Sequence, residues 1–414
     1  MTADSRPNDK AIASVLASEP WLVGVRPAAE VVPGFEPDLI LHAAPPSPWE
    51  GIPRPLRAAL AGAAVFEGLA ASGEEAEARL GAGEIRLAAA QDHGAMAGGM
   101  GAITASTPLL VVEDRAGGGR AFHFLMEGFG RALILGLVGA DVFARLAWLR
   151  DELAPTLDAA LAELGGIDAR ALMAEALRRG DELHNRNAAA TSMLAEALAP
   201  ALASAPAAAR ERAFAFLRGN PQFFVGVSLA ATRLALAAGH AVTGSTLLTA
   251  TGANGRECGI KVSGAGERWF TAPAELPAGV LLTGFEPADV GPVCGDSLAV
   301  ECAGLGATVL AGAPALWPLV GADADRARQI FADTALIALG EHPFYRVPAL
   351  GDAGAPAGID VARVVATGVR PVIDIVMIHR EPGGGMIGFG LTSPPMACFE
   401  QAARAVAETN ATRP

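Results

Sequence analysis

The densest group of chemically active side chains in the sequence is the block GDELHNRN at 180–187. It places one histidine among carboxylates and carboxamides, inside a region otherwise rich in alanine and leucine. A histidine changes charge near neutral pH and can carry a proton, and asparagine side chains can orient an amide substrate. We therefore predict His184 as a catalytic residue and Asn185, Arg186 and Asn187 as substrate-binding residues.

The spacing within this block predicts a continuation of the preceding helix. On a helix, Asp181, His184 and Asn185 would share one face, and Glu182 would pair with Arg186. Buried polar groups need partners, so such a cluster in an apolar region favours a functional site. The alternative is an exposed helix face on which Glu182 and Arg186 form a solvated ion pair.

A second block, QDHGAMAGGMGAITAS, follows the end of a predicted strand. Asp92 can orient the imidazole of His93, and the glycines that follow free backbone amides that can bind an anion. We predict His93 as catalytic and Asp92 as substrate-binding. The alternative is a tight connection between strands without chemistry of its own.

A third block, TGANGRECGIKVSGAGERWF, combines cations and glycines. Arginine and lysine beside flexible backbone suit a phosphate or carboxylate ligand, and Lys261 is one of only two lysines in the chain. We predict Lys261 as catalytic and Asn254, Arg256, Glu257 and Ser263 as substrate-binding. The alternative is a β-hairpin with exposed charges, because Asn-Gly is a strong hairpin-turn signal.

Two later blocks add binding candidates. In CGDSLAVECAGLGA, Asp296 is either a substrate ligand or part of a structural helix N-cap, which we favour slightly. In IHREPGGGMIGFG, His379 and Arg380 end a strand, and Gly384 and Gly385 follow in a glycine-rich loop that could bind an anion. The glycines also match GxGxxG, but we do not interpret a lone match as a nicotinamide site.

The elements that must position these blocks predict an α+β fold. Residues 1–131 alternate strand and helix patterns, and residues 132–240 show apolar residues at helical spacing almost throughout. Residues 241–414 return to short, glycine-rich strands with a helix near 324–340 and another near 395–408. We predict two mixed α/β domains, 1–131 and 241–414, with an all-helical domain at 132–240 between them.

Composition limits the class of partner. The 414 residues carry 31 Lys and Arg against 44 Asp and Glu, a formal net charge of −13. This charge argues against nucleic acid and anionic membrane surfaces. The four cysteines lack metal-ligand spacing and the N-terminus lacks a signal-peptide core, so we expect a cytoplasmic protein with reduced thiols. The sequence predicts no cofactor and no metal site.

Several blocks together resemble a known family. In order, they are GDELHNRNAAAT, GNPQFF, GIKVSGAGERWFTAPA, GDSLAVECAGLG, GIDVARVVATGVRP and the IHR…GGGMIGFG…PP…CFE ending. From about Leu41 to Ala405 the chain resembles the AllG-like (YlbE-like) family, subunits of oxamate carbamoyltransferase. It departs from the family at two positions. The family often has a second histidine after the pair that is Asp92-His93 here, and this chain has Gly94 there. The family usually has His-Lys where this chain has His379-Arg380.

The resemblance implies a carbamoyl transfer in anaerobic allantoin and purine catabolism. Oxalurate and phosphate would give oxamate and carbamoyl phosphate. It also implies two companion subunits, one similar to the succinyl-CoA synthetase α chain, and an α+β fold with a helical insert. Homo-oligomerisation stays open.

Such a phosphorolysis needs cations for phosphate, donors for a developing oxyanion and a proton for the departing amide. Our hypothesis assigns the anions to Lys261 with Arg256 or Arg380, the proton to His184 or His93, and the carbamoyl amide to Asn185, Asn187 and Asn254. Two alternatives stay open. The chain could be a non-catalytic binding or scaffold subunit, or a stand-alone ureidohydrolase or amidohydrolase that uses water.

Overall fold

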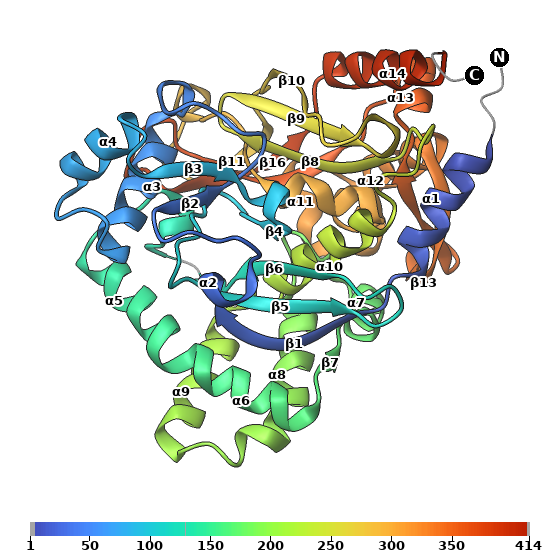
Figure 1. Cartoon of the computed structure of the whole chain (residues 1–414). Helices are drawn as coiled ribbons and strands as arrows, with labels where there is room; N and C mark the ends of the chain where they lie inside the picture. Colours follow the sequence, from blue (N-terminus) through green and yellow to red (C-terminus); the bar gives the residue numbers. More distant parts are fainter. Residues whose placement is uncertain (1–4, 129, 412–414) are drawn as a thin grey trace.

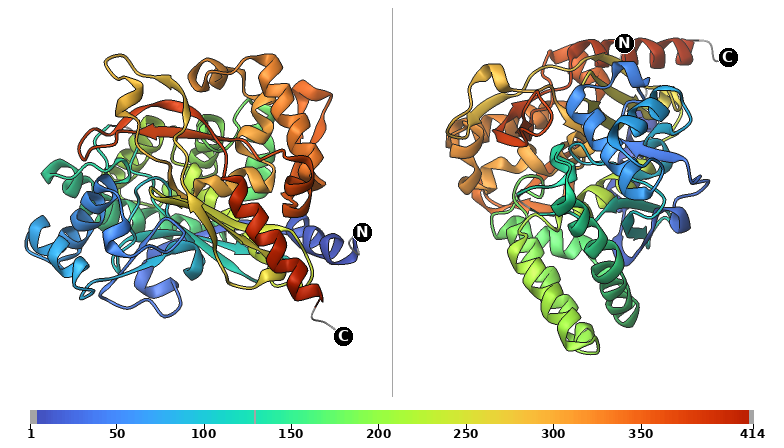
Figure 2. Two further views of the ribbon diagram at one scale, coloured as in Figure 1. Left: turned by 90° about the horizontal axis from the view of Figure 1, so that it is seen from above. Right: turned by 90° about the vertical axis from the view of Figure 1, so that its left-hand side faces the viewer.

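The computed structural model describes residues 5–128 and 130–411 and confirms a mixed α+β fold. The sheets occupy the middle and upper parts of Figure 1, and the helices α6 (Ala154–Leu164), α8 (Ala188–Leu202) and α9 (Ala207–Gly219) of the intermediate region extend below them. Seen from the side in Figure 2, these helices form two arms that project from the body. The domain limits at 131 and 240 stay predictions.

A five-stranded sheet, in the order β4-β6-β5-β1-β7, forms the base of the body. In its central pair, Leu22 lies opposite Val112 and Val25 opposite Leu110, and all four side chains are buried. Residues 132–240, which the sequence predicts to be all helical, contribute the strand β7 to this sheet. This strand is too short to produce an alternating hydrophobic pattern in the sequence. The strands are β1 (Pro20–Pro27), β4 (Ala95–Met96), β5 (Pro108–Asp114), β6 (Arg120–Phe124) and β7 (Ile167–Asp168).

One flank of this sheet carries a small α/β unit. Its parallel strands β2 (Leu39–His42) and β3 (Arg86–Ala89) pair through the apolar segment Leu39–His42, which is fully buried. A proline in the first turn favours the start of α3, and Gly68, at φ +82°, ends that helix in the left-handed conformation. The helices of the N-terminal region are α1 (Ser5–Ala17), α2 (Ala28–Val31), α3 (Arg54–Glu67) and α4 (Gly73–Gly81).

The intermediate region is helical apart from β7. Its last helix, α10, packs on β5 and β6. This close approach depends on Gly226, where a Cβ would lie 2.8 Å from Leu110 Cδ1 and 3.0 Å from His123 Nδ1. The helices are α5 (Ala140–Trp148), continued by a π-helical turn (Leu149–Leu153), then α6 (Ala154–Leu164), α7 (Ala169–Arg178), α8 (Ala188–Leu202), α9 (Ala207–Gly219) and α10 (Val225–Ala238).

The C-terminal region contains three antiparallel units. The first confirms the Asn-Gly hairpin, because β8 and β9 pair across a turn in which Gly255 has φ +83°. Its order is β10-β9-β8-β12, the second unit is β11-β16-β15, and the third is β13-β14. The strands are β8 (Leu248–Asn254), β9 (Glu257–Val262), β10 (Phe270–Pro273), β11 (Ala278–Leu281), β12 (Cys294–Gly295), β13 (Ala338–Val347), β14 (Ala353–Ile359), β15 (Ile373–Ile378) and β16 (Met386–Thr392).

Helices cover these units. The two helices predicted in this region are confirmed as α12 (Ala324–Ile337) and α14 (Met396–Ala411), and α14 lies at the top of Figure 1. Between β12 and α12 the chain forms the 3₁₀ helices η7 (Asp296–Ala303) and η8 (Gly306–Gly312) and the short helix α11 (Trp317–Val320). A further short helix, α13 (Val361–Thr367), lies between α12 and α14 in the chain. None of the described helices is long and apolar enough to cross a membrane.

Candidate functional site

The GDELHNRN block forms a buried loop between α7 and α8, so its prediction as a helix is wrong. Gly180, at φ +90°, ends the helical turn, and Leu183 also has a positive φ of 71°. The carboxylate of Glu182 then accepts hydrogen bonds from the backbone amides of His184 (2.6 Å), Asn185 and Arg186 (2.9 Å). A side chain that binds three successive amides replaces the helical hydrogen bonds and fixes the loop.

The exposed-face alternative is also wrong, because Glu182 is fully buried and binds the backbone amide of Arg186, not its guanidinium. Arg186 Nε instead lies 3.4 Å from Asp181 Oδ1. Asp181 Oδ2 accepts a hydrogen bond from Ala190 N (2.9 Å) in the first turn of α8. Burial raises the pKa of Asp181 to about 6. The two acids thus anchor both ends of the loop.

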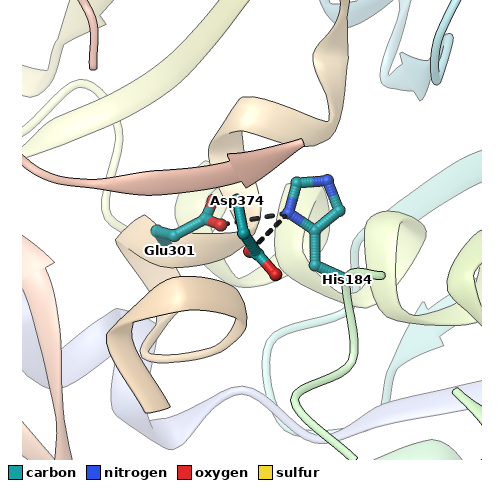
Figure 3. Close-up of side chains that lie close together, drawn as sticks. All are labelled: His184, Glu301 and Asp374. Carbon is teal, nitrogen blue, oxygen red and sulfur yellow. Dashed lines mark hydrogen bonds and ion pairs between the residues drawn. The ribbon is translucent and has the colours of Figure 1, made fainter. Parts of the chain in front are cut away.

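The loop presents His184 to two carboxylates from distant parts of the chain (Figure 3). His184 Nδ1 lies within hydrogen-bonding distance of Glu301 Oε1, at 3.0 Å, and 3.3 Å from Asp374 Oδ1. Glu301 comes from η7 and Asp374 from β15, and both carboxylates are fully buried. The imidazole is 6% exposed. Three elements therefore converge on one buried polar cluster.

The charges in this cluster depend on one another. Burial disfavours the imidazolium, but Glu301 and Asp374 outweigh it and hold the pKa of His184 well above its ordinary value. Burial raises the pKa of Glu301 to about 8. Burial would raise the pKa of Asp374 as well, but the close contact with His184, 3.3 Å from Nδ1 to Oδ1, and the charge of that ring hold it below its ordinary value. A positively charged His184 beside Asp374 is the state that this arrangement favours.

A cavity of about 110 Å³ adjoins this cluster and is lined by His184. Nδ1 faces the carboxylates, and Nε2 lies on the other edge of the ring (Figure 3), so Nε2 can reach a molecule in the cavity. The polar lining comes from His184, Asn185, Gln222 and Ser297, with Cys294 beside them. The rest is glycine and apolar: Gly98, Gly99, Met126, Gly128, Ile134, Leu135, Val225, Leu229, Ile375, Val376, Ile378 and Met386. A mostly apolar cavity with few convergent polar groups is typical of a small-molecule site.

Two predicted neighbours of His184 support the site from different positions. Asn185 lines the cavity, and its carbonyl accepts a hydrogen bond from Gln222 Nε2. Asn187 is buried and donates from Nδ2 to His184 O (2.9 Å) and to Gln222 Oε1 (2.8 Å). Asn187 therefore holds the loop, while Asn185 can contact a ligand.

A separate polar cluster contains the predicted residues Asp92 and Lys261. Lys261 Nζ lies 2.7 Å from Asp92 Oδ1 and 2.7 Å from Glu267 Oε2. Trp269 Nε1 donates to Asp92 Oδ1 at 3.0 Å. His93 is half-buried next to Asp92, and none of these residues lines the cavity. The structure thus divides the three predicted catalytic residues between two places.

The remaining residues of the third block bind the surrounding backbone. Asn254 Nδ2 donates to Pro45 O (2.9 Å), and its Oδ1 accepts from the amides of Arg256 and Glu257. Ser263 Oγ donates to Gly239 O at 2.7 Å. Arg256 is exposed and Glu257 is half-buried. These contacts shape the β8–β9 hairpin and its neighbours.

Asp296 joins three segments of the chain. Its Oδ1 accepts from Ala44 N (2.8 Å) and Gln91 Nε2 (2.7 Å), and its Oδ2 accepts from Ala97 N (2.8 Å). The segment Gly295-Asp296-Ser297 does begin a helix, with Gly295 at the N-cap position of η7, but the Asp296 side chain does not cap that helix. Burial raises the pKa of Asp296 to about 7.

The C-terminal block forms the β15–β16 hairpin at the edge of the cavity, where Ile378 and Met386 line it. His379 Nδ1 accepts from Glu381 N (2.9 Å), and His379 N donates to Gly385 O (2.9 Å). A Cβ on Gly384 would lie 2.2 Å from His379 Cγ, so this ring requires a glycine there. Arg380 is exposed.

Sequence reasoning missed the two carboxylates on His184. Glu301 stood in a recognised block but was not selected, and Asp374 was overlooked. The available signal was a single acid inside the apolar strand segment VIDIVMI, since a buried carboxylate must find a partner. Gly306, at φ +57°, leaves the room for Glu301, because a Cβ there would lie 2.3 Å from Glu301 Oε1.

Comparison with known proteins places this chain in a family. The family model described as "Oxamate carbamoyltransferase subunit AllG" matches residues 85–297. The AllG subunit of oxamate carbamoyltransferase from Escherichia coli K12 is 38% identical over 414 residues, which cover 99% of both chains. The chain belongs to the AllG family.

Two further relatives show how far this likeness extends. An uncharacterized protein of E. coli K12, YahG, is 37% identical over 397 residues, covering 95% of this chain and 84% of that one. A crystal structure of a conserved protein of unknown function from Enterococcus faecalis V583 has 36% identity and a TM-score of 0.96, with 98% of both chains covered. The range that the family model matches, 85–297, contains the His184 loop. Glu301 and Asp374 lie C-terminal to that range.

Proposed function

We propose that this chain is a subunit of a carbamoyltransferase complex and that its cavity binds a ureido acid. Membership of the AllG family supports the class of reaction. One observation supports the location of the substrate site: His184, which Glu301 contacts at Nδ1, lines a cavity of about 110 Å³. The proposed reaction is oxalurate plus phosphate to oxamate plus carbamoyl phosphate, or its reverse.

In this reaction a phosphate oxygen attacks the ureido carbonyl carbon, and the bond from that carbon to the oxamate nitrogen breaks. Its electron pair goes to the nitrogen, which gains a proton. The Nε2–H of His184 would donate to the carbonyl oxygen as it gains negative charge, or to the departing nitrogen. The side chain of Asn185 would orient the carbamoyl amide, and the apolar lining would limit access of water.

The phosphate needs positive charge, and the residues described as lining the cavity include neither lysine nor arginine. We do not assign the phosphate to Lys261, whose ammonium group already contacts two carboxylates. A companion subunit, such as the one similar to the succinyl-CoA synthetase α chain, would then supply part of the phosphate site. The pathway proposed is allantoin and purine catabolism.

The test is an assay of carbamoyl phosphate formation by this chain with and without its companion subunits, over a panel of ureido acids that includes oxalurate. We expect phosphate-dependent product from the complex. A panel is required because Gly94 and Arg380 depart from the family pattern. Ammonia release without phosphate would instead support a stand-alone ureidohydrolase. Full activity after substitution of His184 and Asn185 would support a scaffold subunit and overturn the proposed site.

A further inference from the structure

We propose that His184, Glu301 and Asp374 bind a divalent transition-metal ion, of the class of Zn²⁺ or Mn²⁺, on the Nδ1 side of the imidazole. The inference goes beyond the proposed function and does not depend on it. No metal-ligand spacing marks these residues in the sequence, because they lie on a loop, on η7 and on β15.

One ligand atom from each of the three side chains lies within 4.8 Å of the others. Nδ1 is 3.0 Å from Glu301 Oε1 and 3.3 Å from Asp374 Oδ1. Ligand atoms that each lie about 2.0–2.2 Å from one metal ion are separated from one another by about 2.8–3.1 Å at cis positions of an octahedron and by about 3.3–3.6 Å in a tetrahedron. The two measured separations fall within these ranges.

Three buried carboxylate oxygens in this cluster have no hydrogen-bond partner among the described residues. Neither oxygen of Asp374 accepts a hydrogen bond from any described residue, and neither does Glu301 Oε2, although both side chains are fully buried. Leaving a buried acceptor without a partner is unfavourable, and more so when that acceptor is charged. The single imidazole nitrogen that faces these three oxygens cannot donate to all of them, whereas a cation bound between them would interact with each.

The donor set selects the class of ion. One imidazole nitrogen with two carboxylates suits Zn²⁺, Mn²⁺ and related transition ions, while an all-oxygen set would suit Mg²⁺ or Ca²⁺. The neighbouring carboxylate of Glu182 is already satisfied by three amides and is not needed as a ligand. With an ion on Nδ1, the remaining ring hydrogen of His184 must lie on Nε2, so the ion fixes the tautomer that donates toward the cavity.

The rival explanation is a proton shared between Glu301 and Asp374. It predicts no metal uptake, so direct binding separates the two. The full chain is treated with chelator, dialysed, and titrated with Zn²⁺ and separately with Mn²⁺. We expect about one equivalent per chain by mass spectrometry after gel filtration, and a thermal midpoint that rises by several degrees with the ion.

Glu301→Gln and Asp374→Asn should each weaken uptake about tenfold or more, whereas Asp325→Asn, an exposed carboxylate on α12, should keep one equivalent. If either buried variant does not fold, anomalous diffraction from wild-type crystals soaked in Zn²⁺ replaces it. The expected peak lies between His184 Nδ1 and the two carboxylates.

Wild-type chain without uptake, uptake unchanged in the folded ligand variants, or an anomalous peak elsewhere would each overturn the inference. These readouts need no substrate. An active complex whose wild-type chain takes up no metal would refute the metal site and leave the proposed function intact, whereas an inactive complex that binds the metal would refute only the function.

Discussion

His184 Nδ1 and Glu301 Oε1 share a hydrogen bond of 3.0 Å in the interior, although the two residues are 117 positions apart in the chain. The bond joins the loop before α8 to η7, and Asp374 of β15 lies next to it. It orients a ring that also lines the cavity. The predictions below test this arrangement and the elements that support it.

His184→Gln should reduce carbamoyl phosphate formation by the complete complex by about a hundredfold, because a positioned proton donor contributes on the order of 10²–10⁴ in rate. Glutamine keeps a similar size but lacks an ionisable group. The measurement is the rate of phosphate-dependent product formation, with circular dichroism to verify folding. Arg328→Gln on exposed α12 serves as the control and should match the wild type. A His184 variant with full activity would refute the assigned role.

Glu182→Gln should lower the free energy of unfolding by about 2–4 kcal/mol. In the wild type both carboxylate oxygens accept hydrogen bonds from backbone N–H groups of the loop. Glutamine replaces one of these oxygens by an NH₂ group, which is a donor, so buried N–H groups lose their acceptor. Urea unfolding gives the value. The matched change Glu175→Gln removes only an exposed pair with Arg179 on α7 and should cost less than about 0.5 kcal/mol. Equal effects of the two changes would contradict the role of Glu182 in fixing the loop.

Lys261→Met distinguishes a catalytic lysine from a structural one. The ammonium lies 2.7 Å from two carboxylate oxygens and is nearly buried, so its loss should destabilise the chain by about 1–3 kcal/mol. Activity of the folded complex should fall less than about fivefold, since Lys261 does not line the cavity. A large fall in turnover without a loss of stability would instead support its predicted catalytic role.

The stability of the chain should depend on pH through Asp296. Its pKa is raised by burial from 3.8 to about 7, so the folded state holds this proton more tightly than the unfolded state. The carboxyl therefore contributes stability that is fully present below about pH 4 and is lost as the pH rises through about 7. It accepts hydrogen bonds from Gln91 and from the amides of Ala44 and Ala97, the charge of Asp92 raises its pKa further, and the buried Arg233 also interacts with it electrostatically.

The measurement compares wild type with Asp296→Asn in urea unfolding between pH 4 and 8. Asparagine does not titrate but places its amide against donors, so the variant is less stable at every pH. The advantage of the wild type over the variant should shrink from pH 4 to pH 7, by about 1.4 kcal/mol for each unit of the pKa difference at most. An advantage that grows with pH would contradict the raised pKa.

Much of the fold followed from local pattern. The apolar period identified the α+β class, the helices of the intermediate region, α12 and α14, and the Asn-Gly turn identified the β8–β9 hairpin. The pattern failed at GDELHNRN because the helical period continues there, while Gly180 and the carboxylate of Glu182 redirect the backbone. It also failed at β7, whose strand exists only by pairing with β1.

The sequence by itself determined the family and the apolar elements, and it marked His184 as a candidate, because these depend on residue identity and on neighbours close in the chain. Only the tertiary structure decided which groups surround that histidine. Glu301 and Asp374 reach it from η7 and β15, while Lys261 and Asp92 form a cluster elsewhere. The physical reason is that a buried charge is stabilised by partners brought close in space, and a linear pattern does not contain that proximity.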